Sequence, residues 1–465
     1  MTRTLIALLI GALLSPVAQA NTALPKDLPP YGADKPLPVP EISQTTLDNG
    51  LSVWVVPREG IPRVDFVLSF KGAGLAADEA SMPGFASTLA SMLNEGTEKR
   101  SSREIAETAQ SYGGSVGAYA SNDGLTVAAN ALASQAEPML ALLAEVARTP
   151  SFPENEVTLA KANALQGLKA AEAQPGFRAE RAISAAVYGD HPYARTQPTE
   201  ASIEAITREQ LQAAHAQRLR PDQALLVITG RIDAETALKY ATEAFGDWKV
   251  EGKAAAAIPM ARTQAKPSFV HLDRSGSVQS SVRIGSPSIP ASHPDYVPLR
   301  LTSTILGGGF SSRLMQNLRE DKGYTYGAGV GYRAGLSGGG MIASADVRNE
   351  VTGAAIGEFL HEYQRIGNEA VSADELQMNQ RYVAGGYLIS NQLQASVAST
   401  LASNWLVGLP PEFLGEYVPK IRAVDAKQVQ AMGKKYFDPK AQSIIVVGDK
   451  SVVAELKEFG KFEEQ

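Results

Sequence analysis

Residues Ile203–Gly230 read IEAITREQLQAAHAQRLRPDQALLVITG, and residues Ile421–Gly448 read IRAVDAKQVQAMGKKYFDPKAQSIIVVG. The two stretches align without a gap at a constant offset of 218 residues. Each begins with a helical pattern, passes through a proline and ends with a short apolar run and a glycine, as a helix followed by a buried strand does. Two unrelated helix–strand units would be the alternative, but the offset, the proline and the glycine agree. The pattern therefore predicts a duplicated domain.

The repeat divides the chain into two similar halves. We predict a first domain at residues 41–250, a linker at residues 251–267, where helix and strand periodicity is lost, and a second domain at residues 268–465. The turn signal Asn49-Gly50 between two β-rich runs predicts a hairpin. Long amphipathic helices are predicted at residues 151–173 and 372–392. The fold class is α+β, with two similar domains, each a mostly antiparallel sheet with helices packed on one face.

Composition limits the class of protein. The 465 residues are 44% hydrophobic and 20% charged, which is typical of a globular protein with a sizeable core. There is no cysteine, so packing must stabilise the fold without disulfides. The formal net charge of -6 argues against nucleic acid as the main partner.

The N-terminus has the pattern of a secretory signal peptide at residues 1–20. Arg3 precedes an apolar run at residues 5–14, and Ala18-Gln19-Ala20 is a small-residue cleavage site. The apolar run is shorter than the ~20 residues that a membrane-spanning helix needs, and no later stretch is long and uncharged enough. Residues 21–40 contain six prolines and predict an extended N-terminal arm. We therefore expect an exported protein without a membrane span, located in a bacterial periplasm.

Three ordered motifs carry a resemblance to a known family. They are TTLDNGLSVWVV (residues 45–56), GFASTLASMLNEGTEKRSSREIAE (residues 84–107) and LGGGFSSRLMQNLREDKGYTYG (residues 306–327). The chain resembles the pitrilysin and insulinase family of zinc peptidases, the inverzincins, which includes the mitochondrial processing peptidases. The resemblance spans both halves. It implies a pair of similar α/β domains, in agreement with the repeat.

In active members of this family the second motif reads H-x-x-E-H on a helix, with two histidines that bind zinc and a glutamate that acts as general base. The resemblance places these positions at Ser87, Ala90 and Ser91. A hydroxyl is a poor zinc ligand beside imidazole, and alanine cannot take a proton. The family's third ligand is a glutamate that would fall around residues 166–168, where there is no carboxylate. The resemblance thus implies no metal site and no cofactor in this chain.

The histidines and one serine motif are the other candidate metal ligands and nucleophiles, and their spacing and context do not favour either role. The five histidines have no pair close in sequence, so each is interpreted as solvent-facing or hydrogen-bonded rather than as a ligand. They are His191, His215, His271, His293 and His361. The stretch GGSVG at residues 113–117 matches the nucleophile-elbow pattern around Ser115. However, a helix is predicted before it and strands after it, which is the reverse of the context that an elbow needs.

The third motif keeps an arginine and, seven residues later, a tyrosine, at Arg319 and Tyr326. In the family, such a pair reaches the active site from the other domain and donates hydrogen bonds to the peptide and to the charge on the attacked carbonyl. Tyr324 is the nearby alternative for the tyrosine. Gly308 and Gly309 belong to a glycine run that we interpret as a tight turn where another backbone, such as that of a bound peptide, comes close. The lysine of a phosphate-binding P-loop does not follow the run.

The resemblance also implies how a chain with the Arg–Tyr pair but without zinc ligands could act, because family heterodimers join a subunit with the zinc motif to one that lacks it. We expect a non-catalytic subunit of a periplasmic heterodimeric zinc endopeptidase, with zinc in a homologous partner, Arg319 and Tyr326 acting in trans, and peptides or unfolded polypeptides as substrate. The altered helix would maintain packing through Leu89, Met92 and Leu93. A catalytically dead binding or scaffold protein is the alternative. A self-sufficient peptidase of another mechanism would lack a nucleophile–base pair.

Overall fold

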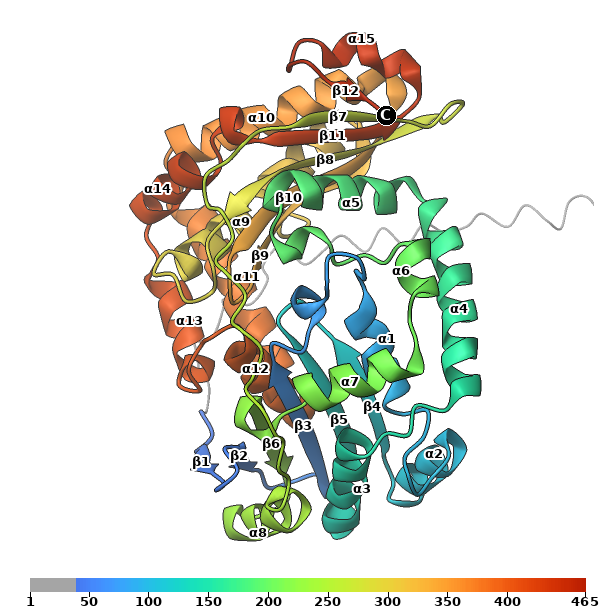
Figure 1. Ribbon diagram of the computed structural model, residues 1–465. Coiled ribbons are helices and arrows are strands. Elements are labelled where there is room, and N and C mark those ends of the chain that lie inside the picture. Colours follow the sequence, from blue (N-terminus) through green and yellow to red (C-terminus); the bar gives the residue numbers. More distant parts are fainter. Residues whose placement is uncertain (1–38) are drawn as a thin grey trace, which may run out of the picture. The chain divides into compact units, whose positions relative to one another are not determined.

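Figure 1 shows the computed structural model, which describes residues 39–465. The expected signal peptide, residues 1–20, and almost all of the expected arm, residues 21–40, lie outside the described residues. Within the described part of the chain, no helix is long and apolar enough to cross a membrane.

The first half contains a six-stranded sheet in the order β1-β2-β6-β3-β5-β4. Its neighbouring strands are antiparallel except for β2 and β6, which are parallel. The hairpin predicted at Asn49-Gly50 is confirmed by the pairing of β1 with β2. The strands are β1 (Ser43–Thr46), β2 (Ser52–Pro57), β3 (Arg63–Lys71), β4 (Ser115–Ala120), β5 (Gly124–Leu132) and β6 (Ala224–Gly230). The helices are α1 (Phe85–Met92), α2 (Ser102–Ser111), α3 (Ala136–Arg148), α4 (Glu154–Glu172), α5 (Pro175–Tyr188), α6 (Glu200–Glu204), α7 (Arg208–Arg218) and α8 (Ala234–Phe245).

The second half contains a six-stranded sheet in the order β12-β7-β11-β8-β10-β9. Here β7 is parallel to both β11 and β12, and the other neighbours are antiparallel. The strands are β7 (Phe269–Asp273), β8 (Gln279–Ser288), β9 (Thr325–Ala334), β10 (Gly339–Arg348), β11 (Ser443–Gly448) and β12 (Glu463–Glu464). The helices are α9 (Tyr296–Gly307), the π-helix η5 (Met315–Asp321), α10 (Thr352–Asn368), α11 (Ala373–Ser390), α12 (Gln394–Leu406), α13 (Phe413–Ala423), α14 (Ala426–Tyr436) and α15 (Val453–Leu456).

The structure confirms the duplication. The bounds of α7 and α14 differ by the offset of 218 residues at both ends. Both helices begin with a capping box, which Thr207 forms with Gln210 and Asp425 forms with Gln428. Each is followed by a fully buried strand, β6 or β11, at the equivalent place in its sheet. The α+β fold of two similar domains is therefore confirmed.

Each sheet has a main core on one face and a helix from the opposite half on the other face. On the first sheet, Val397 and Leu401 of α12 pack against Trp54, Val67 and Val227. On the second sheet, α5 contributes the buried residues Ile183, Val187 and Tyr188, which pack with Ile342 and Ile445. Figure 1 shows α12 against the first sheet and α5 against the second. This reciprocal exchange explains why β6 and β11 are apolar on both faces.

Candidate functional site

The helix α1 contains Ser87, Ala90 and Ser91, the positions to which the resemblance assigns the zinc motif. Its sequence FASTLASM turns Phe85, Ala86, Leu89, Ala90 and Met92 inward, so that one face joins the core of the first half. Leu89, Met92 and the following Leu93 are fully buried, as predicted. The helix therefore retains a packing role that is independent of any ligand.

The zinc-motif positions themselves cannot hold a metal. Ser87 and Ser91 are exposed, and Ala90 is buried. The hydroxyl of Ser91 donates to the carbonyl of Thr88 at 3.0 Å, so it is used within its own helix. Among residues 39–465, no cluster of three or more histidine, aspartate or glutamate side chains could hold a metal ion. Two neutral hydroxyls without a carboxylate or imidazole do not form a zinc site.

The position expected for a third ligand lies on α4. There Gln166 is exposed and Leu168 is buried, so neither side chain offers a zinc-binding group. The nearby Glu172 forms an ion pair with Arg181 at 3.0 Å. The family's zinc chemistry consequently does not fit the first half of this chain.

A buried ion pair holds α1 in place. Both carboxylate oxygens of Asp78 accept a hydrogen bond from the N–H of Ala86 at 3.1 Å, in the first turn of α1. Arg218, at the end of α7, donates to Asp78 at 2.8 Å and lies over the ring of Phe85. Burial raises the pKa of Asp78, although Arg218 and the N–H of Ala86 oppose this shift. Asp78 was not predicted from the sequence, because its partners lie 8 and 140 residues away.

Most histidines have structural partners. His191 and His215 hydrogen-bond the carbonyls of Pro259 and Ala147, both at 2.8 Å. His293 accepts from the N–H of Asp295 at 3.0 Å, as part of a local turn. Burial lowers the pKa of both His191 and His215, which keeps them neutral near pH 7. These contacts agree with the interpretation of hydrogen-bonded histidines for three of the five. The interpretation is wrong for His271, which is 1% exposed and whose two ring nitrogens have no hydrogen-bond partner in the described part of the chain.

The glycine run follows α9 and packs against the edge strand β9. A Cβ on Gly307 would lie 2.4 Å from the backbone nitrogen of Val330, so only glycine fits there. A Cβ on Gly308 would lie 2.6 Å from Cα of Thr304, one turn earlier. The backbone that comes close to Gly307 is thus the chain's own β9. Peptide contacts at Gly308 and Gly309 stay a prediction.

Arg319 lies on the π-helix η5, a form with a wider turn than an α-helix. Its guanidinium carbon is 4.5 Å from the ring centre of Phe310, which is a cation–π contact. Its ion pair, at 3.4 Å, is with the adjacent Glu320, and the Arg319 side chain is 37% exposed. The guanidinium is therefore placed at the surface rather than in a buried ion pair.

Tyr326 is near the start of β9 and is 89% exposed. Tyr324, the alternative tyrosine, is partly buried against the core of the second half. The N–H of Tyr324 donates to the carbonyl of Leu318 at 2.9 Å, so the chain folds back beside the π-helix before β9 begins. Of the two tyrosines, Tyr326 is the one whose side chain faces solvent.

Two further exposed aromatic side chains lie beside Arg319 and the glycine run, and neither was predicted from the sequence. Phe310 is 61% exposed and Tyr382, on α11, is 59% exposed. A Cβ on Gly309 would lie 3.3 Å from the ring of Tyr382, so this ring sits beside the glycine run. Their signal in the sequence is weak, because an isolated aromatic residue in a helix or loop is usually part of a core.

Comparison with known proteins agrees with this fold. A family model described as insulinase (peptidase family M16) matches residues 67–198, and one described as peptidase M16 inactive domain matches residues 205–383. A relative from Bacillus subtilis, named uncharacterized zinc protease YmxG, is 25% identical over 85% of this chain and 96% of its own. A relative from Helicobacter pylori, named non-peptidase homolog YmxG, is 23% identical over 82% and 88% of the two chains.

A solved structure has the same fold. The crystal structure described as a peptidase M16 inactive domain from Pseudomonas fluorescens is 26% identical, covers 88% of this chain and 98% of its own, and has a TM-score of 0.82. The two sheets, the duplication and the matching models define a two-domain protein of the metallopeptidase type. The chain belongs to peptidase family M16, and its match to the inactive-domain model and to a solved inactive-domain structure supports an inactive member of that family.

Proposed function

We propose that this chain is the non-catalytic subunit of a heterodimeric zinc endopeptidase, and that it supplies Arg319 and Tyr326 to the zinc site of a homologous partner. Peptides or unfolded polypeptides are the proposed substrate. The names of the relatives include both a zinc protease and a non-peptidase homolog, which suits a family that contains both kinds of subunit.

The observation that carries the proposal is the exposure of the Arg319–Tyr326 region. Tyr326 is 89% exposed, and Arg319 lies on the exposed ring of Phe310. An arginine or tyrosine with a purely structural role is usually buried or firmly paired, because apolar surface left in water contributes no stability. Exposed aromatic residues gathered around an arginine are typical of a surface that contacts a ligand or partner.

The chemistry of the pair suits peptide hydrolysis. A guanidinium carries several N–H donors and stays protonated, and a phenol adds one O–H donor. When both are directed at the oxygen of an attacked carbonyl, they stabilise the negative charge that develops there. The zinc, when bound in the partner, would polarise the carbonyl and activate water. The present chain would orient the peptide and stabilise the charge on the carbonyl oxygen.

A periplasmic location is part of the proposal. Its support is the leader-like sequence at residues 1–20 and the absence of cysteine from the 465 residues. An oxidising compartment poses no risk of wrong disulfides to a chain without thiols. The homologous partner would carry the same kind of leader and an intact H-x-x-E-H motif.

The test is to purify the tagged chain from periplasm with its bound proteins and to assay cleavage of a fluorogenic peptide. We expect a homologous partner with the H-x-x-E-H motif, bound zinc and peptidase activity. Arg319→Ala should lower kcat by roughly 10²- to 10³-fold, as the loss of one oxyanion donor does. Tyr326→Phe should lower kcat in the same direction, with the amount of copurified partner unchanged.

Two control variants make this test specific. Arg103→Ala removes an exposed arginine of α2 that pairs with Glu107, and Tyr324→Phe removes the hydroxyl of the alternative tyrosine. Both should leave kcat within about twofold, because neither variant removes a group that the proposal directs at the carbonyl oxygen. Recovery of the chain without a zinc-motif partner and without activity would overturn the proposal in favour of a scaffold protein of the same fold.

A further inference from the structure

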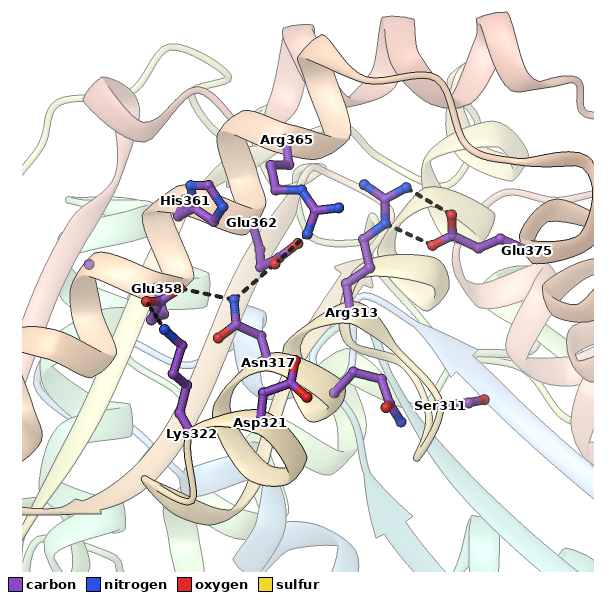
Figure 2. Close-up of a pocket in the computed structure, with 12 residues that line it drawn as sticks. Ser311, Arg313, Asn317, Asp321, Lys322, Glu358, His361, Glu362, Arg365 and Glu375 are labelled. Carbon is purple, nitrogen blue, oxygen red and sulfur yellow. Dashed lines mark hydrogen bonds and ion pairs between the residues drawn. The ribbon is translucent and has the colours of Figure 1, made fainter.

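The π-helix that carries Arg319 forms one wall of a polar hollow of about 540 Å³, and α10 and the start of α11 form the others. Figure 2 shows its side chains, and charges of both signs face each other across it. The charged residues with defined contacts are Arg313, Lys322, Glu358, Glu362, Arg365 and Glu375. They come from η5 and the residues that flank it, from α10 and from α11. The proposed function uses none of them.

Asn317 is the central residue of this network. Its Nδ2 donates one hydrogen bond to Glu358 and a second to Glu362, both at 2.9 Å. Figure 2 shows the amide between the two carboxylates. An amide nitrogen carries two hydrogens, so Asn317 uses its full donor capacity to join η5 to two successive turns of α10.

The two glutamates are in turn fixed by cations. Glu358 pairs with Lys322 at 3.1 Å, and Glu362, which is only 1% exposed, pairs with Arg365 at 2.8 Å. Burial opposes ionisation of Glu358, but the hydrogen bonds from Asn317 and Lys322 lower its pKa below the ordinary value. Glu358 is therefore a charged acceptor at neutral pH, and a hydrogen bond to a charged acceptor is the stronger kind.

The backbone of η5 contains a π-turn that needs stabilising contacts. The N–H of Lys322 donates to the carbonyl of Asn317, five residues back, at 3.0 Å. A π-turn of this kind is rare and less favourable than an α-turn, so it persists only where other contacts stabilise it. Leu314 and Leu318 are buried in the core on one side of the segment, and Asn317 is bonded to α10 on another. Arg319 is two residues from Asn317 on the same turn.

We infer that Asn317 is a positioning residue, which holds the π-turn so that the Arg319 guanidinium is presented beside Phe310. This inference rests on the proposed function, because it assigns Asn317 a role only through Arg319. Arg313 supports the same segment, since its guanidinium binds both oxygens of Glu375 at 2.7 and 2.8 Å and so ties the start of η5 to α11.

The test uses Asn317→Asp, which keeps the shape of the side chain but replaces both donors by a third carboxylate. In the isolated chain, hydrogen exchange of the amides at residues 315–323 should become faster. In the complex, kcat should fall about ten- to a hundredfold with KM unchanged, which is the usual effect of misplacing a reacting group by about 1 Å. In the Arg319→Ala background, Asn317→Asp should cause no further loss of kcat.

Two further variants separate positioning from general damage. Asn317→Gln retains an amide donor and should recover most of kcat, and Gln316→Ala, an exposed neighbour at the same hollow, should change neither readout. Unchanged exchange at residues 315–323 would overturn the inference whatever the function of the protein. Faster exchange with unchanged kcat, in a complex that Arg319→Ala inactivates, would overturn the inference alone. No effect of Arg319→Ala on an active complex would overturn the proposed function, and the inference with it.

Discussion

Asp78 shows how the altered helix α1 keeps its place. Its side chain is 1% exposed, and it joins the first turn of α1 to Arg218 at the end of α7. A carboxylate at the N-terminus of a helix also interacts favourably with the helix dipole. The exposed side chains of Ser87 and Ser91 therefore do not determine the position of α1, which depends on Asp78 and on the buried face of the helix.

Arg218→Met should destabilise the protein strongly, because it leaves the Asp78 carboxylate buried without its cation. Breaking one partner of a buried ion pair costs roughly 3 to 5 kcal/mol of unfolding free energy. Urea denaturation of the purified chain measures this loss. Arg103→Met is the matched control: Arg103 pairs with Glu107 at 2.7 Å, but both side chains are mostly exposed. Its effect should stay below about 1 kcal/mol, and equal losses in the two variants would contradict the role of Asp78.

Single residues were only partly predictable from the sequence. Ser87, Ala90 and Ser91 could be placed on a helix, because the apolar spacing of Leu89 and Met92 fixes its buried face. The exposure of Tyr326 could not be predicted, because Tyr324 has the same type of side chain in the same strand region. The difference arises from the return of the chain along the π-helix, which local sequence does not encode.

Among the elements, the exchanged helices α5 and α12 link the two halves most directly. Leu401 of α12 is fully buried against the first sheet, although its own half contains the second sheet. Ile183 of α5 is fully buried against the second sheet. Each half thus supplies a helix that covers one face of the other half's sheet. Neither sheet could bury both faces with the helices of its own half alone.

Leu401→Ala should reduce the stability of the whole molecule. A buried leucine replaced by alanine costs about 2 to 5 kcal/mol. Because α12 belongs to one half and covers the sheet of the other, scanning calorimetry should show one transition at lower temperature. Ser399→Ala, an exposed position on the same helix, should shift the transition by about a degree or less, as surface changes do. A separate early transition for the first sheet alone would contradict this coupling.

The periodicity of the sequence predicted the long helices, but it did not predict which elements pack together. The long helices expected at residues 151–173 and 372–392 are present as α4 and α11, because their polar and apolar spacing is a local property. The exchange of α5 and α12 was not predicted, since an apolar helix face does not specify which sheet it covers. The π-helix was not predicted either, because its anchor joins Asn317 to residues 41 and 45 positions away.

At the level of the whole molecule, two equivalent hairpins meet between the halves. Asp123 lies between β4 and β5, and Leu336 and Ser337 lie between β9 and β10. The hydroxyl of Tyr193 is hydrogen-bonded to Asp123 and accepts from the N–H of Ser337 at 3.1 Å. The second oxygen of Asp123 accepts from the N–H of Leu336 at 3.1 Å. One partly buried carboxylate thus joins the hairpins of both halves.

Because Asp123 is titratable, the stability that this junction contributes should depend on pH. Burial raises the pKa of Asp123 above its ordinary value, although Tyr193, Leu336 and His191 act in the opposite direction. The folded chain therefore holds this proton more tightly than the unfolded chain does. Below pH ~4 the carboxyl is protonated in both states and carries no penalty. As the pH rises from there through the pKa that Asp123 has in the folded chain, the unfolded chain releases its proton first. The free energy of unfolding therefore decreases.

Asp123→Asn removes this titration, so the stability of the parent chain relative to the variant should decrease as the pH rises through that window. Urea denaturation at steps between about pH 4 and 7 measures the difference. Asp233 is the control with the opposite sign: as the N-cap of α8 it accepts from Thr236, which lowers its pKa. Relative to Asp233→Asn, parent stability should rise from about pH 4 to 5 and then stay level, because near pH 4 only the unfolded chain still binds a proton at this carboxyl. Slopes of the same sign for both variants would contradict a raised pKa of Asp123 at the junction between the halves.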